Sequence, residues 1–315
     1  MRIAILGATS EIAKDLILTF AKSETHSLAL FARRPETVKQ WLNDISCNHV
    51  CEAHSFDQFQ TSDHFDAIIN FVGVGNPAKT AALGAGIFDI TSKYDDLALQ
   101  YVEVHPNCKY IFLSSGAAYC STFDEPANEN TKSSIDLNHL KPQDWYGVAK
   151  LHAECRHRAM PHLAIVDVRV FNYFSHTQNM SSRFLITDII RAIRDKAIFE
   201  TSNAFMMRDY LHPSDFYQLV KRILNSPPIN AGVDCYSKSP IDKHQLLSVM
   251  AREFSLTYKV LTYESAIQTT GSKPNYYSMN QNAFLKFKYE PRFSSEEAVI
   301  EQTRLSLKTS MGSSC

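Results

Sequence analysis

Three polar side chains of this chain could together exchange a proton with a carbonyl or hydroxyl oxygen. Tyr146 and Lys150 stand four residues apart, which puts both on one face of a helix. We expect the Lys150 ammonium group to lower the pKa of the Tyr146 phenol from its ordinary value of about 10, so that the phenol exchanges protons near neutral pH. Ser115 comes just after the apolar run 110–113 and supplies a hydroxyl that can hold the same oxygen. Ser115, Tyr146 and Lys150 are therefore the predicted catalytic residues.

The spacing of this pair is not decisive by itself, because Tyr217 and Lys221 repeat it. Tyr146, however, stands near the start of a predicted helix that follows the fifth strand-like segment, whereas Tyr217 comes after the regular pattern of strands and helices has ended. The alternative interpretation is structural: an interior tyrosine, a lysine with a buried stem and a serine that caps a strand end. Position in the predicted fold favours the catalytic interpretation.

Short runs of β-branched and aliphatic residues alternate with helical patterns through the first half of the chain. The predicted strands are Arg2–Leu6, Ser27–Phe31, His49–His54, Ala67–Val72, Tyr110–Leu113 and Ile165–Val170, and helices are predicted over Glu11–Lys22 and Trp145–Met160. Strands that alternate with helices pair in parallel and carry helices on both faces. The sequence therefore predicts an α/β fold with a Rossmann-type doubly wound parallel sheet. The alternation fades after Phe174, so we expect a smaller C-terminal substrate-binding lobe.

The turn between the first strand and the first helix stands where a Rossmann sheet binds the pyrophosphate of a dinucleotide on backbone N–H groups. Its residues predicted to contact the cofactor are Gly7, Thr9, Ser10, Glu11 and Ile12. The glycine pattern is incomplete, because Ser10 and Ala13 occupy its second and third positions. The Ser10 hydroxyl could donate to a phosphate oxygen; the alternative is a degenerate turn that binds nothing.

The residues after the next strands bear on which dinucleotide would bind. Arg33 and Arg34 stand where an NAD site places an acidic residue on the adenosine ribose, and a guanidinium there pairs with a 2′-phosphate. An exposed basic helix start is the alternative. We expect Asp57 to meet the adenine, and Phe71, Val72 and Gly73 to run along the cofactor. The sequence thus favours NADP(H) over NAD(H), with Lys150 also bonding the nicotinamide ribose.

Four motifs in order resemble the extended short-chain dehydrogenase/reductases, and within them the nucleotide-sugar epimerases, dehydratases and reductases. The motifs are Ser114 to Tyr119, the pair Tyr146 and Lys150, Arg169 to Asn172, and Arg208 to Asp215. Tyr289-Glu290-Pro291 resembles the closing segment of the family, with Lys288 where the family has glycine. The resemblance implies that Ser115, Tyr146 and Lys150 catalyse and that Asn172 and Arg208 contact the substrate diphosphate. A loop-capping role for Asn172, and an ion pair of Arg208 with Asp209 or Asp215, are the alternatives.

Departures from the family narrow the expected reaction. Family 4,6-dehydratases carry Asp-Glu directly after the catalytic hydroxyl, whereas Gly116 and Ala117 stand there in this chain and cannot move a proton. Ser10 and the arginine pair also differ from the epimerases, which keep NAD bound. We therefore expect NADPH-dependent reduction of a nucleotide-linked keto-sugar, specifically a 4-keto-6-deoxyhexose. The alternatives are a nucleotide-sugar epimerase with bound NAD(P) and a catalytically silent NADPH-binding regulatory protein. The NADP-binding Rossmann domain is predicted over 1–172, with 209–236 returning to it, and the substrate-binding lobe over 173–208 and 237–315.

Composition bounds the remaining partners. Lys and Arg number 32 against 33 Asp and Glu, a net charge of −1, so no basic surface for nucleic acid or an anionic membrane is expected. The seven cysteines are scattered, which favours free thiols and a cytoplasmic location. No metal is expected at Cys47 and Cys51, because the nearby His49 and His54 belong to a predicted strand. The family resemblance implies a homodimer.

Overall fold

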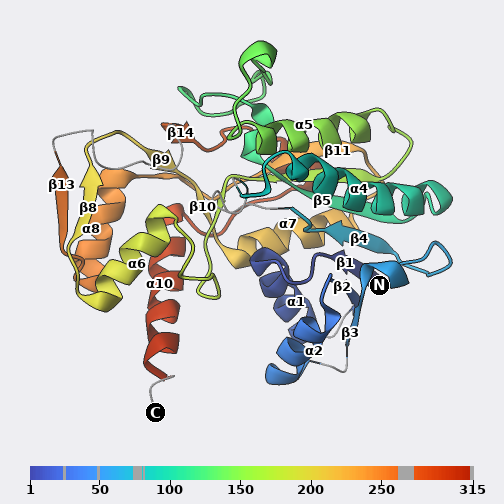
Figure 1. The fold of residues 1–315 in the computed structure, drawn as a ribbon, viewed down its shortest axis with the longest axis horizontal. Coiled ribbons are helices and arrows are strands. Elements are labelled where there is room, and N and C mark those ends of the chain that lie inside the picture. Colours follow the sequence, from blue (N-terminus) through green and yellow to red (C-terminus); the bar gives the residue numbers. More distant parts are fainter. Residues whose placement is uncertain (24–25, 48–49, 74–79, 81, 262–272, 313–315) are drawn as a thin grey trace.

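The computed structural model describes residues 1–312 apart from 24–25, 48–49, 74–79, 81 and 262–272. Its centre is a sheet of seven parallel strands in the order β11-β6-β5-β4-β1-β2-β3 (Figure 1). These strands are β1 (Arg2–Leu6), β2 (Ser27–Phe31), β3 (Cys51–His54), β4 (Ala67–Asn70), β5 (Lys109–Ser115), β6 (Ile165–Val170) and β11 (Ala231–Cys235). The strand order reverses between β1 and β4, where open α/β sheets bind their ligands. The predicted Rossmann-type doubly wound sheet is confirmed.

The seventh strand is the one that the sequence pattern did not predict. β11 pairs in parallel with β6 along its whole length, from Ala231 opposite Val166 to Cys235 opposite Val170. Its sequence holds a glycine and the fully buried Asp234, so it does not look like a continuous apolar run. The boundaries of the other strands differ from the predicted ones by a few residues, and His49 lies outside the described residues.

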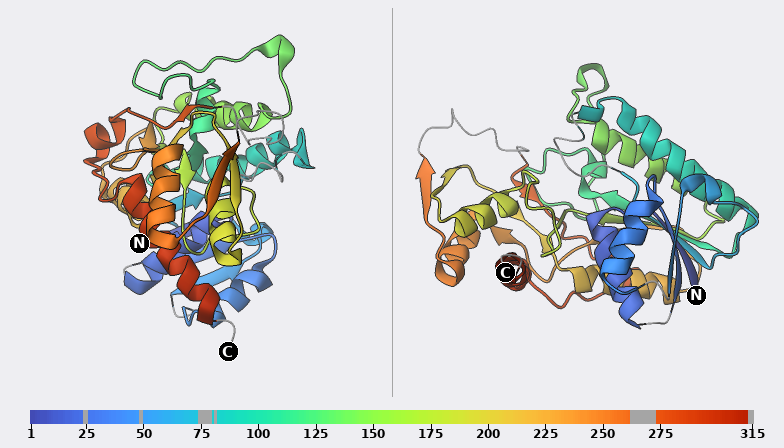
Figure 2. Two further views of the ribbon diagram at one scale, coloured as in Figure 1. Left: turned by 90° about the vertical axis from the view of Figure 1, so that its left-hand side faces the viewer. Right: turned by 60° about the horizontal axis from the view of Figure 1, so that its bottom comes forward.

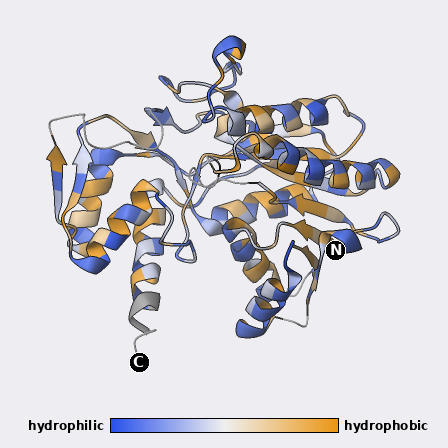
Figure 3. Cartoon of the chain, in the orientation of Figure 1, coloured by the Kyte–Doolittle hydropathy of each residue, from blue (hydrophilic) through white to orange (hydrophobic). Residues whose placement is uncertain are grey.

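Helices cover both faces of the sheet. α1 (Glu11–Ser23), α2 (Pro35–Asp44), α7 (Pro213–Asn225) and α9 (Asn282–Phe287) pack on one face. α4 (Gly86–Val104) and α5 (Trp145–Arg158) pack side by side on the other face. The strands between these two layers are coloured mainly hydrophobic in Figure 3, as expected for a sheet that is buried on both faces.

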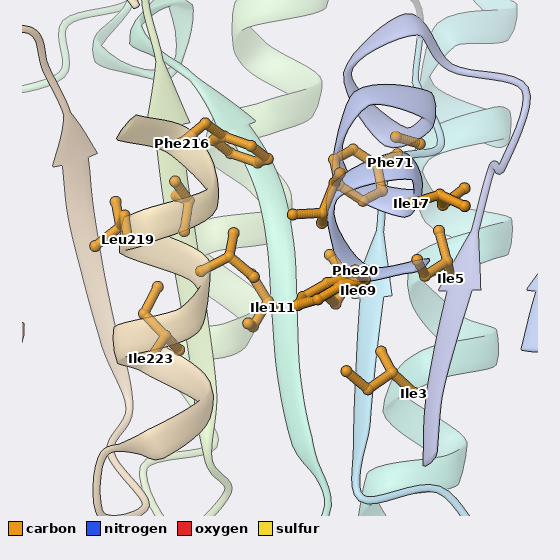
Figure 4. Close-up of a cluster of buried hydrophobic side chains, with 14 of the residues drawn as sticks. Ile3, Ile5, Ile17, Phe20, Ile69, Phe71, Ile111, Phe216, Leu219 and Ile223 are labelled. Atoms are coloured by element: carbon orange, nitrogen blue, oxygen red, sulfur yellow. The ribbon is translucent and has the colours of Figure 1, made fainter. Parts of the chain in front are cut away.

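The core beneath α1 and α7 shows why these segments form helices there. Buried apolar residues of α1 stand three and four positions apart, from Ala13 to Leu16 and Ile17 and from these two to Phe20, and so form one buried stripe. Figure 4 shows this stripe and the matching stripe of α7 against side chains of the strands, among them Ile3, Ile5, Ile69 and Ile111. Each such side chain contributes about 1.5–3 kcal/mol when it is fully buried.

The second lobe has its own apolar cluster. It is built from α6 (Leu185–Asp195), α8 (Lys243–Phe254), α10 (Ser295–Gly312) and the parallel pair β8 (Phe199–Ser202) and β13 (Tyr258–Leu261). Figure 2 shows these elements beside the sheet. α9 lies in the segment that we assigned to this lobe, yet its Ala283 and Phe287 belong to the core of the sheet. None of the described helices combines the length and the apolar character needed to cross a membrane.

Lys288 ends α9 in a left-handed conformation, with a φ of 55°. Glycine adopts this conformation without strain, whereas a side chain makes it unfavourable. Lys288 stands where the family pattern has glycine, and the backbone there still has the conformation that suits glycine.

A buried ionic cluster joins α4 and α5 to β6. His157 of α5 is fully buried, with Nδ1 2.6 Å from Asp167 Oδ1 and Nε2 2.8 Å from Asp95 Oδ1. Arg156 pairs with Oδ2 of Asp95, and Arg158 pairs with Oδ2 of Asp167. Burial opposes the charge on His157, but the Asp167 and Asp95 carboxylates outweigh it and raise the pKa of His157 to about 9.

We predict that His157 makes the stability of the protein depend on pH. Because its pKa is higher in the folded state than in the unfolded state, its contribution is complete below pH about 6.5 and falls as the pH rises towards 9. The free energy of unfolding by urea should therefore differ most between the wild type and His157→Gln at pH 6.5. The difference should shrink by up to about 1.4 kcal/mol per pH unit towards pH 8.

The exposed His244 provides the matched control, since His244→Gln should leave the pH dependence unchanged. Parallel curves for the wild type and His157→Gln would show that His157 is not a charged link between the two carboxylates.

Candidate active site

One cavity runs along the carboxyl ends of β1, β4 and β5 and continues into the second lobe. It brings together residues that are far apart in the sequence. Its wall contains most of the predicted site residues, namely Gly7, Thr9, Ser10, Glu11, Ile12, Arg33, Phe71, Val72, Gly73, Ser115, Tyr146, Lys150, Asn172 and Arg208. Their convergence follows from the parallel sheet, because the segments after successive parallel strands meet at one edge.

Two predicted cofactor residues do not line this cavity. Arg33 and Arg34 are both exposed, but only Arg33 lies in the cavity wall, and Arg34 directly precedes α2. Asp57 is exposed in a short 3-10 turn after β3, and Phe56 lines the cavity instead. Phe56 packs against Tyr94 with ring centroids 4.3 Å apart, so an aromatic pair occupies the place where we expected a carboxylate. The roles assigned to Arg34 and Asp57 remain predictions without geometric support.

The turn after β1 packs tightly against the ends of β2 and β4. Gly7 has a φ of +82°, and the N–H groups of Gly7 and Ala8 both donate to the Phe31 carbonyl, at 2.9 and 3.2 Å. A Cβ on Gly7 would lie 3.0 Å from the backbone nitrogen of Val72. Glu11 begins α1, and its carboxylate accepts the N–H of Asn179 at 3.0 Å, which ties this turn to a segment of the second lobe.

Ser115, Tyr146 and Lys150 meet where α5 starts beside the end of β5. Lys150 is buried, and its Nζ donates to the Leu113 carbonyl at 2.7 Å and lies 4.2 Å from the centre of the Phe112 ring. Burial lowers the pKa of Lys150 to about 8, although nearby carboxylates, first that of Asp95, oppose the shift.

The pKa of Tyr146 differs from the sequence prediction. Burial raises it above its ordinary value, and a hydrogen bond with the Ser115 hydroxyl lowers it only in part. The prediction that Lys150 makes this phenol more acidic is therefore wrong for this structure. The physical reason is that the Lys150 ammonium group bonds the Leu113 carbonyl, while desolvation dominates at the phenol. Tyr146 accordingly keeps its proton at neutral pH.

A second tyrosine, which the sequence analysis did not identify, reaches the same serine. Tyr276 belongs to the short strand β14 (Asn275–Tyr276), and its hydroxyl lies 3.2 Å from that of Ser115. Burial raises the pKa of Tyr276, and its bond with Ser115 opposes that shift. Tyr276 stands in a polar stretch without any recognisable motif, so only the folded chain shows that it lines the cavity.

The two predicted substrate residues surround Tyr276. Asn172 donates to the Tyr276 carbonyl at 3.5 Å, a long bond, and Arg208 donates to the Lys273 carbonyl at 2.8 Å. Arg208, Lys243 and Lys273 all line the cavity, and within the described residues none of them forms an ion pair. The ion pair of Arg208 with an aspartate, considered above, is therefore not formed. This end of the cavity is electrostatically suited to an anionic ligand.

We found no group of three His, Cys, Asp or Glu side chains that could hold a metal ion among the residues described by the structure. His49, which we considered with Cys47 and Cys51, lies outside those residues.

We predict that Gly7→Ala weakens dinucleotide binding at least about 10-fold. The methyl group meets the Val72 backbone, and the positive φ costs about 1 kcal/mol or more for alanine. Titration of NADPH fluorescence and urea unfolding measure the two effects. Gly86→Ala is the control, because a Cβ there meets nothing within 4 Å. If Gly7→Ala binds NADPH as tightly as the wild type, the predicted role of this turn in dinucleotide binding is wrong.

The fold resembles solved structures along its whole length. A UDP-glucose-4-epimerase from Stenotrophomonas maltophila, with bound NAD and formylated UDP-arabinopyranose, has a TM-score of 0.82, 12% identity and 100% coverage of both chains. A dTDP-glucose 4,6-dehydratase from Bacillus anthracis in complex with NAD has a TM-score of 0.77 and 14% identity, covering 99% of this chain and 98% of that one. A UDP-glucuronic acid 4-epimerase from Bacillus cereus in complex with NAD has a TM-score of 0.74 and 15% identity, covering 98% and 99%.

Sequence comparison gives a family but no individual relative. No curated protein matches the chain. The model of the NAD dependent epimerase/dehydratase family matches residues 3–232, which is well over half of the sequence. This chain therefore belongs to the NAD-dependent epimerase/dehydratase family.

Proposed function

We propose that this protein is an NADP(H)-dependent reductase of a nucleotide-linked keto-sugar. The observation that carries the proposal is Tyr146, a phenol whose pKa is raised by burial and which lies in the cavity wall beside Ser115. A reductase needs a proton donor at the carbonyl oxygen, and a phenol that keeps its proton at neutral pH meets that need.

The residues present fit a bound dinucleotide. Gly7 lets the turn pass close to the Val72 backbone, where a Cβ would be crowded, and the turn leads into the N-terminus of α1, so backbone N–H groups at that N-terminus can hold a pyrophosphate. Arg33 lies in the cavity wall at the end of β2, where its guanidinium can pair with a 2′-phosphate. Lys150 can donate to the ribose hydroxyls next to the nicotinamide. When bound, NADPH supplies the hydride that goes to the carbonyl carbon.

Each side chain then has a defined task at the carbonyl oxygen. Ser115 donates a hydrogen bond that holds this oxygen, and Tyr146 transfers its phenolic proton to it as the C=O bond becomes a C–OH bond. A proton from solvent then restores the Tyr146 phenol. Ser115 and Lys150 are buried and Tyr146 is half-buried, which strengthens these interactions.

The surroundings of Ser115 support reduction rather than dehydration. A Cβ on Gly116 would lie 2.5 Å from the Phe171 ring, so there is no room for an acidic side chain at that position. Ala117 cannot transfer a proton. Arg208, Lys243 and Lys273, which form no ion pair with the residues that the structure describes, support a diphosphate-linked substrate. We therefore propose a nucleotide-linked 4-keto-6-deoxyhexose as the substrate. From the family resemblance and the scattered cysteines we also propose a cytoplasmic homodimer.

A nucleotide-sugar epimerase is the second candidate, favoured by the NAD-bound epimerases among the similar structures. An epimerase reoxidises its cofactor within each cycle, so it consumes no NADPH. Mass spectrometry of the purified protein, combined with an assay of nicotinamide absorbance, separates the two functions.

We predict that the protein oxidises NADPH in the presence of a nucleotide 4-keto-sugar and that Tyr146→Phe lowers kcat by about 10²-fold or more, because the proton donor is lost. Tyr217→Phe is the matched control, since Tyr217 has the same spacing to a lysine but is a half-buried residue of α7 that packs against the core of the sheet. If the folded protein consumes no NADPH with any of several nucleotide 4-keto-sugars, the reductase function is refuted. If Tyr146→Phe is as fast as the wild type, the role of Tyr146 is refuted.

We further predict that Arg33 sets the cofactor preference. Arg33→Ala should weaken NADPH binding about 10-fold or more and leave NADH binding almost unchanged, because only NADPH carries the 2′-phosphate. Arg34→Ala, which alters the neighbouring guanidinium outside the cavity, should leave both affinities within about twofold. Equal affinities of the wild type for the two cofactors would assign the site to NAD(H) instead.

A further inference from the structure

A ring of polar side chains begins and ends at the two serines that close β5. The Ser114 hydroxyl donates to Glu154 Oε1 at 2.5 Å. Glu154 is buried on α5, one helical turn after Lys150. The first bond of the ring therefore joins the end of β5 to the helix that carries two of the predicted catalytic residues.

The ring continues through Arg169 to β11. Arg169 of β6 donates its Nε to both Glu154 oxygens at 3.0 Å, and its Nη1 to Asp234 Oδ1 at 3.2 Å. Gly232 of β11 makes room for this guanidinium, because a Cβ there would lie 2.8 Å from Arg169 Nη2. Charge-assisted bonds of this kind are short and directional, so they hold their partners in one arrangement.

Asp234 carries the ring into the second lobe. Its carboxylate is fully buried and accepts the Ser278 hydroxyl at 2.6 Å, in addition to the Tyr119 hydroxyl at 2.9 Å. Ser278 stands two residues after Tyr276, whose hydroxyl lies 3.2 Å from that of Ser115. The ring thus closes at the serine next to the one where it began.

The members in the middle of the ring do not reach the cavity. Glu154, Arg169, Asp234 and Ser278 are absent from its wall, whereas Ser114, Ser115 and Tyr276 line it. Both oxygens of Asp234 have donors, so the buried network is satisfied and favours a single geometry. The network reaches the cavity wall through Ser278, which stands two residues after Tyr276.

We propose that Asp234 and Ser278 are positioning residues, which hold Tyr276 of the second lobe against Ser115 and so set the geometry in which Ser115 receives the substrate oxygen. Tyr276 touches Ser115, whereas Asp234 is linked to Tyr276 through Ser278. The effect on the reaction rests on the proposed function, but the physical link between Asp234 and Tyr276 does not depend on it.

The first test measures this link without any substrate. In the wild type the Asn275 amide donates to the Phe123 carbonyl at 2.9 Å and the Met279 amide to the Ala127 carbonyl at 2.7 Å. Ser278→Ala should increase hydrogen exchange of these two amides about 10-fold or more and leave exchange in β1 and β4 unchanged. Ser278→Thr, which keeps the hydroxyl, should return exchange towards the wild-type rate.

Ser226→Ala is the matched control for this test. It removes a serine hydroxyl bond to the Ile223 carbonyl at the end of α7, far from the ring. Unchanged exchange of both amides in Ser278→Ala would overturn the proposal, because the segment would then be held by other contacts. Asp234→Asn should act like Ser278→Ala; if it fails to fold because Arg169 loses one of its two carboxylate partners, Ser278→Ala still decides.

The second test is a double-mutant cycle in the NADPH assay. Ser278→Ala and Tyr276→Phe should each lower kcat, and the second change should add less than about twofold once the first is present, because both disturb one contact. With Ser226→Ala as the partner, the effects should multiply. If the losses of kcat caused by Ser278→Ala and Tyr276→Phe multiply in the double variant, the positioning role is overturned. If the wild type reduces no sugar, the proposed function fails, and the exchange experiment alone decides whether Asp234 holds Tyr276.

Discussion

α5 is held against the carboxyl end of β5 by two side-chain hydrogen bonds that lie one helical turn apart. Lys150 donates to the Leu113 carbonyl, and Glu154 accepts the Ser114 hydroxyl. Because Tyr146 begins the same helix one turn earlier, these bonds also set where its phenol meets Ser115. The turn after β1 and the segment around Tyr276 line the same cavity as Ser115 and Tyr146, so the shape of the cavity depends on these two bonds.

Charge is placed locally in this molecule, although the chain as a whole is close to neutral. Buried carboxylates, first that of Asp95, lie behind Lys150 and oppose the loss of its proton. Arg208, Lys243 and Lys273 face the cavity without acidic partners among the described residues. An anionic ligand would therefore be met by a few placed cations, and the outer surface needs no excess of positive charge.

Particular residues show how far sequence reasoning reached. Strand and helix patterning predicted the doubly wound sheet, because a sheet buried on both faces requires apolar strands that alternate with amphipathic helices. The same reasoning separated Tyr146 from Tyr217, since the helix of Tyr146 follows a predicted strand, whereas Tyr217 comes after the predicted alternation of strands and helices has ended. It did not predict β11, whose buried Asp234 interrupts the apolar pattern. Nor could it separate Arg33 from Arg34, because the two are neighbours and a difference of one position before α2 decides which of them lines the cavity.

The sequence by itself determined the fold class, the family motifs and the presence of Ser115, Tyr146 and Lys150 near one sheet edge. These features are local or periodic, so neighbouring residues suffice to specify them. Only the tertiary structure decided that the pKa of Tyr146 is raised and that Tyr276 reaches Ser115. Burial and contacts between distant segments exist only once the chain has packed. No pattern of residue types along the chain encodes a distance across 161 positions.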